Sequence, residues 1–130
     1  MFLKKIAGCI IIEENKVLLI KKKSNGWFEL PGGTIEPGES PEQTAIRELK
    51  EEICCDVEIL SLYQEKDFEH KGKRYHGTWF FARRKQDQHP KIGEPEEYTQ
   101  IAFIPLEDLT LLPISPNVKE LLASVEMTRA

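Results

Sequence analysis

The sequence predicts one mixed α+β domain, and three observations carry that prediction. Apolar runs rich in β-branched residues near the N-terminus, such as residues 6–12, indicate β-strands. The stretch from Ser40 to Ile53 carries the signals of a helix, and further strand-like and helix-like segments follow it. The 130 residues show no internal repeat, low-complexity tract or linker, so residues 1–130 are expected to form a single domain.

The N-terminal elements are predicted to form a β-hairpin. Residues 6–12 (IAGCIII) and 17–20 (VLLI) are apolar runs separated by the polar EENK, which is typical of two paired strands. A short apolar run follows at residues 27–30. The Pro-Gly-Gly at residues 31–33 is expected to break regular structure and to begin a loop.

The first helix has the clearest local signals. Ser40 suits the N-cap, Pro41 suits the first helical position, and Gln43 completes a capping box with Ser40. Strong helix formers then continue from Glu42 to about Ile53.

Three strands and a second helix are expected after it. Residues 57–64 and 75–83 are predicted strands joined by a polar segment, and residues 98–104 form a third. Ser115-Pro116 begins a C-terminal helix of about ten residues. Its apolar face consists of Val118, Leu121, Leu122 and Val125.

The charge, the apolar runs and the cysteine content disfavour nucleic-acid-binding, membrane-spanning and secreted proteins. A formal net charge of −4 gives no general attraction to nucleic acid or to anionic membranes. No apolar run approaches the roughly 20 residues of a membrane span, and acids interrupt the short N-terminal run, so no secretory signal is expected. Three cysteines are a poor disulfide framework, which favours a cytoplasmic protein without membrane contact.

The first helix gathers three carboxylates beside its apolar stripe. Glu48, Glu51 and Glu52 fall within an arc of roughly 100°, and the stripe of Ala45, Ile46, Leu49 and Ile53 lies next to them. A solvated charged face is the ordinary explanation of such a helix. However, Glu48 and Glu52 repel each other at a spacing of four residues, by about 0.2–0.5 kcal/mol when exposed.

A divalent cation would remove this repulsion. Carboxylates without an accompanying His or Cys suit Mg²⁺ or Mn²⁺ rather than zinc. Mg²⁺ held in this way shares its remaining positions with waters and substrate phosphates, so the helix indicates phosphate chemistry. The glycines at positions 32, 33 and 38 let the backbone approach a ligand closely.

Residues 33–55, GTIEPGESPEQTAIRELKEEICC, resemble the Nudix box. Gly33, Glu39 and the core Arg47-Glu48-Leu49-x-Glu51-Glu52 match the signature at every charged position. The preceding WFELPGG and the later IAFIPLEDL also resemble family segments, so the chain is identified as a MutT-like member of the Nudix hydrolase family. The resemblance implies an α-β-α sandwich, in which a mixed β-sheet is packed between helices.

One residue departs from the family pattern. Cys54 stands where the family usually has glycine, at the end of the helix. A left-handed cysteine there costs about 1 kcal/mol, unless the helix ends differently.

The resemblance also implies roles for the acidic residues. Glu48 and Glu52 are expected to be the principal ligands of Mg²⁺ or Mn²⁺, with Glu51 contributing directly or through water. The carbonyl of Gly32 is the expected backbone ligand. Structural support of the site is expected from Gly33, Glu39 and Arg47.

The general base is left open between two regions. Glu51 or Glu52 in the helix is one choice, and Glu97 in the loop before the strand at residues 98–104 is the other. Glu94 and Glu96 compete with Glu97, and an exposed acidic loop without catalytic function explains these residues equally well.

Aromatic and basic residues outside the helix are candidates for contact with substrate. The aromatic rings could stack on the base of a nucleotide. Aromatic residues in alternating strands more often belong to a core, so stacking is the weaker interpretation for each of them. The candidates are Trp27, Phe28, Arg74, Tyr75 and Trp79.

The implied reaction is attack of water on a phosphorus of a nucleoside diphosphate linked to another group. The compact chain is similar to enzymes that hydrolyse nucleoside triphosphates, including oxidised ones. Within the family, ADP-ribose hydrolases often carry a proline some fifteen residues after the box and NADH hydrolases a longer proline-rich array, so the absence of proline between residues 42 and 89 disfavours both substrates. Hydrolysis of dinucleoside polyphosphates or RNA 5′ ends, with RNA as a partner, is an alternative, and a non-catalytic nucleotide-binding module is another. Small enzymes of the family are often homodimers.

Overall fold

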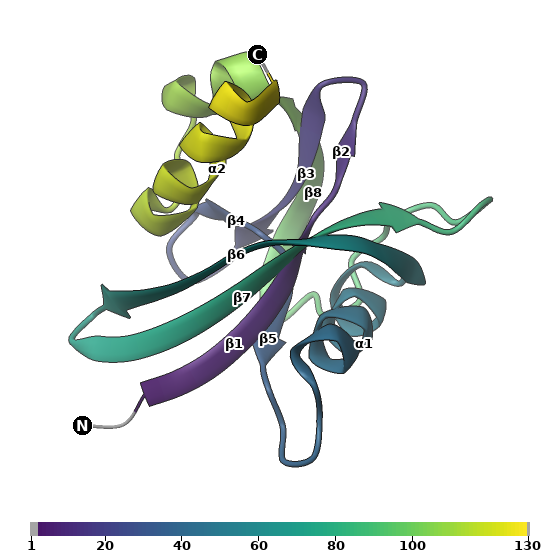
Figure 1. Cartoon of the computed structure of the whole chain (residues 1–130). Helices are drawn as coiled ribbons and strands as arrows, with labels where there is room; N and C mark the ends of the chain where they lie inside the picture. The colour runs from purple at the N-terminus through teal and green to yellow at the C-terminus, as the bar shows by residue number, and fades with distance from the viewer. Residues whose placement is uncertain (1–2, 130) are drawn as a thin grey trace.

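A computed structural model describes residues 3–129 of the chain, which form eight strands, two α-helices and one 3₁₀ helix (Figure 1). In chain order the elements are β1 (Leu3–Ile10), β2 (Ile12–Glu13), β3 (Lys16–Lys22), β4 (Phe28–Glu29), β5 (Gly32–Thr34), α1 (Pro41–Ile53), β6 (Val57–His70), β7 (Lys73–Arg84), β8 (Tyr98–Pro105), the 3₁₀ helix η1 (Leu106–Leu111) and α2 (Pro116–Arg129).

The strands form two sheets rather than the single sheet that the sequence predicts. The first has the order β5-β1-β7-β6 and is mixed, because β1 runs parallel to β7 while the other pairs are antiparallel. The second is antiparallel and centres on β3. This strand pairs with β2 near its start, with β4 near its end and with β8 along its whole length.

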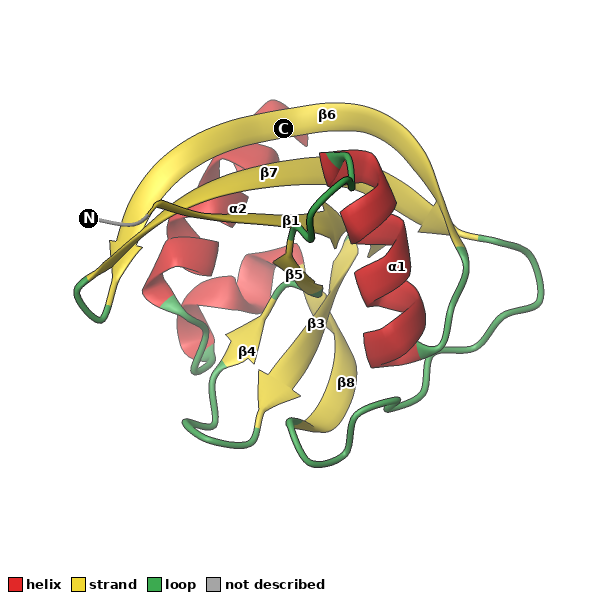
Figure 2. Ribbon diagram, turned by 90° about the horizontal axis from the view of Figure 1, so that it is seen from below, coloured by secondary structure: helices red, strands yellow, loops and turns green. Residues whose placement is uncertain are grey.

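The two α-helices lie on opposite sides of the sheets (Figures 1 and 2). Side chains alternate along β3, so Leu18 and Ile20 pack in the cluster that contains the apolar stripe of α1. Val17 and Leu19 pack on the other side, in the cluster that contains α2. This arrangement confirms the α-β-α sandwich. Within residues 3–129, neither helix has the length and apolar character needed to cross a membrane.

Both helices begin where the sequence predicts. The Ser40 side chain accepts a hydrogen bond from the Gln43 amide at 3.1 Å, and the Gln43 side chain accepts one from the Ser40 amide at 2.9 Å, which completes the capping box. Helix α2 begins at Pro116 and extends a few residues beyond the predicted ten. All four residues of its predicted apolar face are buried.

The predicted N-terminal hairpin is largely wrong. Strand β1 pairs with β7 from Leu3 opposite Arg74 to Ile10 opposite Phe81, and only β2 and the start of β3 form a hairpin. Apolar runs cannot by themselves identify their partners, because a strand that is buried on both faces looks the same in either pairing. The turn between β2 and β3 has positive φ angles at Glu14 and Asn15, as type I′ hairpins require.

Two segments that were expected to be irregular are strands. Residues 32–34 form β5, which pairs with β1 at the edge of the first sheet. The polar segment after residue 64 continues β6 and joins β7 through a tight turn at Lys71 and Gly72. The sequence did not predict the full length of this hairpin, because the side chains at its far end are almost all polar.

We expect Leu49→Ala to lower the free energy of unfolding by about 2–5 kcal/mol, because Leu49 is fully buried between α1 and the sheets. Ile46→Ala is the matched control on the same helix: Ile46 is 39% exposed at the edge of the stripe, so its loss should cost about 1 kcal/mol or less. Urea unfolding followed by circular dichroism measures both values. Equal losses would contradict the packing of α1 described above.

Candidate active site

The three glutamates of α1 differ in how deeply their side chains are buried. Glu52 is only 3% exposed and faces the junction of α1 with the sheets. The side chain of Glu48 is 15% exposed, whereas that of Glu51 is 41% exposed at the outer side of the helix. The carboxylates therefore form a gradient from the solvent toward the interior.

Both oxygens of Glu52 accept hydrogen bonds from the strands. The Gly32 amide in β5 donates to Oε1 at 2.8 Å, and the Tyr98 hydroxyl in β8 donates to Oε2 at 2.9 Å. Burial, together with the negative charge of Glu48, nevertheless raises the pKa of Glu52 to about 8. The carboxylate is thus fixed in position but is costly to ionise without a further positive charge.

Glu48 lies against the glycine turn that precedes the helix. A Cβ on Gly33 would run into the Glu48 carboxylate, so the lack of a side chain at Gly33 makes room for that group. Burial first, and then the charge of Glu51, raise the pKa of Glu48. The predicted supporting position of Gly33 is therefore one of direct contact.

Arg47 joins the loop before the helix to the helix itself. Its Nε donates to Glu39 Oε2 at 2.7 Å in an ion pair, and Nη2 donates to the Thr34 carbonyl at 3.1 Å. Nη1 contacts both oxygens of Glu51, at 2.9 and 3.0 Å. Hydrogen bonds from Arg47 and from the Thr44 hydroxyl lower the pKa of Glu39 to about 2.

The loop before β8 docks on the C-terminal end of α1, which the sequence did not reveal. The Gly93 amide donates to the Glu52 carbonyl and the Lys91 amide donates to the Ile53 carbonyl, both at 3.0 Å. These bonds satisfy carbonyls that a helix end leaves without intrahelical partners. A Cβ on Gly93 would run into the Glu51 carbonyl, so glycine permits this close approach.

This docking brings Glu94 toward the carboxylates of the helix. Glu94 is half-buried, and its negative charge contributes to the raised pKa values of Glu48 and Glu52. Glu97, the residue preferred from the sequence, is exposed, and its backbone carbonyl accepts a hydrogen bond from Lys23. Of the acidic residues in the loop, the structure therefore associates Glu94 with the cluster.

Cys54 adopts the left-handed conformation that glycine usually supplies. Its φ and ψ are 58° and 32°, and its amide donates to the Lys50 carbonyl at 3.1 Å. The helix therefore ends in the usual way despite the substitution. Cys55 is buried in the core, and neither thiol forms a disulfide.

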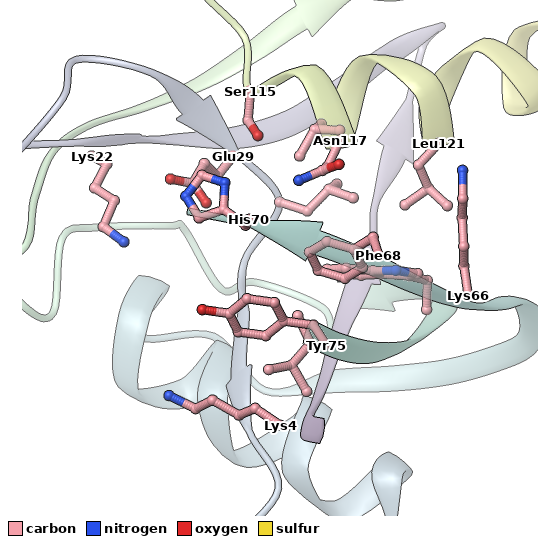
Figure 3. A pocket seen from close by; sticks show the side chains of 14 residues that line it. Lys4, Lys22, Glu29, Lys66, Phe68, His70, Tyr75, Ser115, Asn117 and Leu121 are labelled. Atoms are coloured by element: carbon pink, nitrogen blue, oxygen red, sulfur yellow. The ribbon is translucent and has the colours of Figure 1, made fainter. Parts of the chain in front are cut away.

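A cavity of about 250 Å³ lies between α2 and the strands (Figure 3). Of the predicted substrate contacts, Tyr75 and Trp79 line it, and the rings of Phe68 and Tyr75 stack with centroids 5.2 Å apart. In Figure 3, Lys22 and Glu29 lie on one side of the cavity and Lys66 on the other. Polar residues at its wall that were missed from the sequence include Lys22, Glu29, His70, Ser115 and Asn117.

The other predicted substrate contacts are not at this cavity. Phe28 is 6% exposed and packs in the core with α2, so its ring is not a stacking surface. Trp27 borders a separate hollow near Asn25, and Arg74 is exposed on β7. Periodicity cannot distinguish a core ring from a cavity ring, because both face the same side of a strand.

The acidic residues fit a hard divalent cation by the chemistry of their donors. Glu48, Glu51 and Glu52 offer only carboxylate oxygens; the charge of Glu51 helps to raise the pKa of Glu48, and the charge of Glu48 helps to raise that of Glu52. Among the described residues, no three acidic, His or Cys side chains already converge closely enough to hold one ion. Arg47 contacts Glu51 at the outer side of the helix, whereas Gly32 and Tyr98 hold Glu52.

Comparison with known proteins agrees with this architecture. A family model described as NUDIX domain matches residues 3–125. The 8-oxo-dGTP diphosphatase of Escherichia coli strain K12 is 30% identical over 107 residues, which cover 78% of this chain and 82% of that protein. An ADP-ribose pyrophosphatase of Methanocaldococcus jannaschii is 44% identical over 69 residues, covering 48% of this chain and 41% of that protein.

Solved structures show the same fold. A MutT Nudix hydrolase from Burkholderia pseudomallei superposes with a TM-score of 0.86 at 24% identity, covering 95% of this chain and 98% of that one. The match over residues 3–125 shows that the chain belongs to the Nudix family, whose members generally depend on a divalent metal. It is a MutT-like Nudix hydrolase, a nucleotide pyrophosphohydrolase.

The burial of Glu52 predicts how the metal-free protein responds to pH. Its pKa is raised above that of an unfolded glutamate, so the folded state binds the proton more tightly. The resulting stability is fully present below about pH 4 and is lost as the pH rises toward about 8, with a total on the order of a few kcal/mol. Unfolding in EDTA across this range measures the loss.

Glu52→Gln is the control for this measurement, because the neutral amide cannot titrate. We expect the stability of the wild type to fall relative to that of Glu52→Gln as the pH rises. Parallel curves for the two proteins would show that Glu52 ionises in the folded state at its ordinary pKa.

Proposed function

We propose that the protein hydrolyses nucleoside triphosphates to nucleoside monophosphates and pyrophosphate with Mg²⁺ or Mn²⁺. The observation that carries this proposal is the short chain segment that joins the cavity to the acidic cluster. Glu29 and Leu30 line the cavity, and the amide of Gly32, two residues after Leu30, donates to Glu52 at 2.8 Å. A nucleoside in the cavity would thus leave its phosphates near the carboxylates.

Glu48 and Glu52 are the proposed principal metal ligands, with Glu51 and the Gly32 carbonyl completing the protein's share. An ion held there would stabilise the negative charge that develops on the phosphoryl oxygens during displacement. Arg47 and Glu39 are proposed to orient the loop and helix and not to contact the reacting atoms. Support for this division is that Glu39 already has Arg47 and Thr44 as partners.

Glu94 is our proposed general base, in place of Glu97. Water attacks one phosphorus atom of the α–β anhydride, its proton passes to the Glu94 carboxylate, and the bond from that phosphorus to the bridging oxygen breaks, which releases nucleoside monophosphate and pyrophosphate. The half-buried position of Glu94 and its electrostatic effect on Glu48 and Glu52 support this choice. Burial also raises the pKa of Glu94, which makes it a better proton acceptor than an ordinary carboxylate.

The size of the cavity supports a substrate with one nucleoside. Sites for drug-sized ligands occupy about 300–1,000 Å³, so 250 Å³ suits a single base with part of its sugar. The Escherichia coli relative, named as an 8-oxo-dGTP diphosphatase, supports a nucleoside triphosphate, including an oxidised one. The ADP-ribose pyrophosphatase matches over less than half of the chain and lends less support.

Glu52→Gln should abolish metal-dependent turnover while the fold stays intact, because the amide is isosteric but cannot supply an anionic ligand. The assay incubates the protein with Mg²⁺ and nucleoside triphosphates, ADP-ribose, dinucleoside polyphosphates or triphosphorylated RNA, and resolves the products by chromatography. Glu42→Gln, an exposed residue of the same helix, is the matched control and should keep wild-type activity.

The same panel tests the substrate proposal. Triphosphates should give monophosphate and pyrophosphate faster than the other compounds react. Faster cleavage of ADP-ribose, dinucleoside polyphosphates or RNA would reassign the substrate, near-wild-type activity of Glu52→Gln would refute the metal role, and binding without turnover would favour a regulatory module.

Glu94→Gln should lower kcat by about 10²–10⁴-fold at saturating Mg²⁺, the usual contribution of a positioned general base. Glu97→Gln is the paired control and should change kcat by less than about tenfold, since Glu97 is exposed. Steady-state kinetics on the best triphosphate measures both. The reverse order of effects would assign the base to Glu97, one of the alternatives that the sequence leaves open.

A further inference from the structure

We propose that Tyr98 is a positioning residue, which holds the Glu52 carboxylate in the orientation that a divalent cation requires. The proposal rests on the metal role proposed for Glu52. Nothing in the acidic pattern of the helix indicates it, because Tyr98 belongs to β8, 46 residues further along the chain.

The hydrogen bonds to Glu52 define which lone pairs remain free. An ionised carboxylate has about four acceptor positions, two on each oxygen. The Gly32 amide takes one position on Oε1 and the Tyr98 hydroxyl takes one on Oε2. Each oxygen therefore keeps one position that a cation can use, and the plane of the carboxylate is fixed by donors from two different sheets.

Tyr98 is itself held rigidly. Its amide donates to the Glu94 carbonyl at 3.0 Å, and β8 pairs it with Lys22 at an irregularity in the ladder with β3. Its ring packs against the buried cluster on the α1 side of the sheets. The backbone hydrogen bonds of Tyr98 and the packing of its ring thus fix the position of the hydroxyl beside Glu52.

Removal of the hydroxyl would leave Glu52 with a single donor. Glu52 is nearly inaccessible to solvent, so bulk water cannot simply replace the lost bond, and the charge of Glu48 would act on a carboxylate free to turn about the Gly32 contact. Residues that orient metal ligands in this way typically affect metal affinity by 10–100-fold when they are replaced.

Tyr98→Phe tests the proposal through metal binding, apart from turnover. Free Mn²⁺ is titrated into the whole protein at pH 7.5, and its dissociation constant is measured by electron paramagnetic resonance. We expect the dissociation constant to rise about 10–100-fold. The Mn²⁺ concentration for half-maximal activity should rise in parallel, while kcat at saturating Mn²⁺ changes less than that concentration.

Tyr63→Phe is the matched control. It also removes a half-buried tyrosine hydroxyl, which donates to the Leu121 carbonyl at 3.1 Å on the other side of the sheets. A loss of stability alone would therefore appear in both variants, whereas only Tyr98→Phe should weaken Mn²⁺ binding.

Glu52→Gln separates this proposal from the metal role on which it rests. If Glu52→Gln loses Mn²⁺ binding while Tyr98→Phe binds within twofold of the wild type, the positioning role is overturned and the metal site stands. If Glu52→Gln binds Mn²⁺ as the wild type does, Glu52 is not a ligand and both proposals are overturned.

Discussion

The burial of one carboxylate, that of Glu52, is the constraint on which the rest of the site depends. Removing an ionised carboxylate from water is very costly unless hydrogen bonds and positive charge replace the water. Gly32 in β5 and Tyr98 in β8 donate these hydrogen bonds, so β5, β8 and α1 meet at the Glu52 carboxylate. The molecule does not supply the charge, because no ion pair among the described residues reaches Glu52.

The two ends of the acidic cluster are neutralised in different ways. Arg47 compensates Glu39 and Glu51 at the outer end, where the side chains are partly exposed. Toward the interior, burial and the charges of neighbouring glutamates raise the pKa values of Glu48 and Glu52, and Arg47 offsets this effect only in part and only at Glu48. If the inner end is the metal site proposed above, a divalent cation and a proton would be alternatives there, and metal affinity would depend on pH. The arginine keeps the loop and helix in place in either state.

The sequence identified the helix, its cap and its three carboxylates, since each of these is encoded within a few neighbouring residues. The resemblance placed Glu48 and Glu52 ahead of Glu51, but helical periodicity could not show that Glu52 is buried and Glu51 exposed, because it gives the direction of a side chain and not the depth of its surroundings. The sequence also missed the parallel pairing of β1 with β7 and the docking of Gly93 on α1. These contacts join segments about 40 to 70 residues apart, and neither partner carries a local signal of the other.

Cys54 shows how the end of the helix and the site are joined. A left-handed cysteine is strained where glycine is not, yet α1 still ends at this position. The carbonyls of Glu52 and Ile53 accept hydrogen bonds from Gly93 and Lys91, so the docked loop stabilises the end of the helix from outside. The same docking sets the position of the next residue in the loop, Glu94. The docking that stabilises the end of α1 thus also places the Glu94 carboxylate beside the three glutamates of the helix. A substitution that weakens this docking should therefore destabilise the helix end and displace Glu94 together.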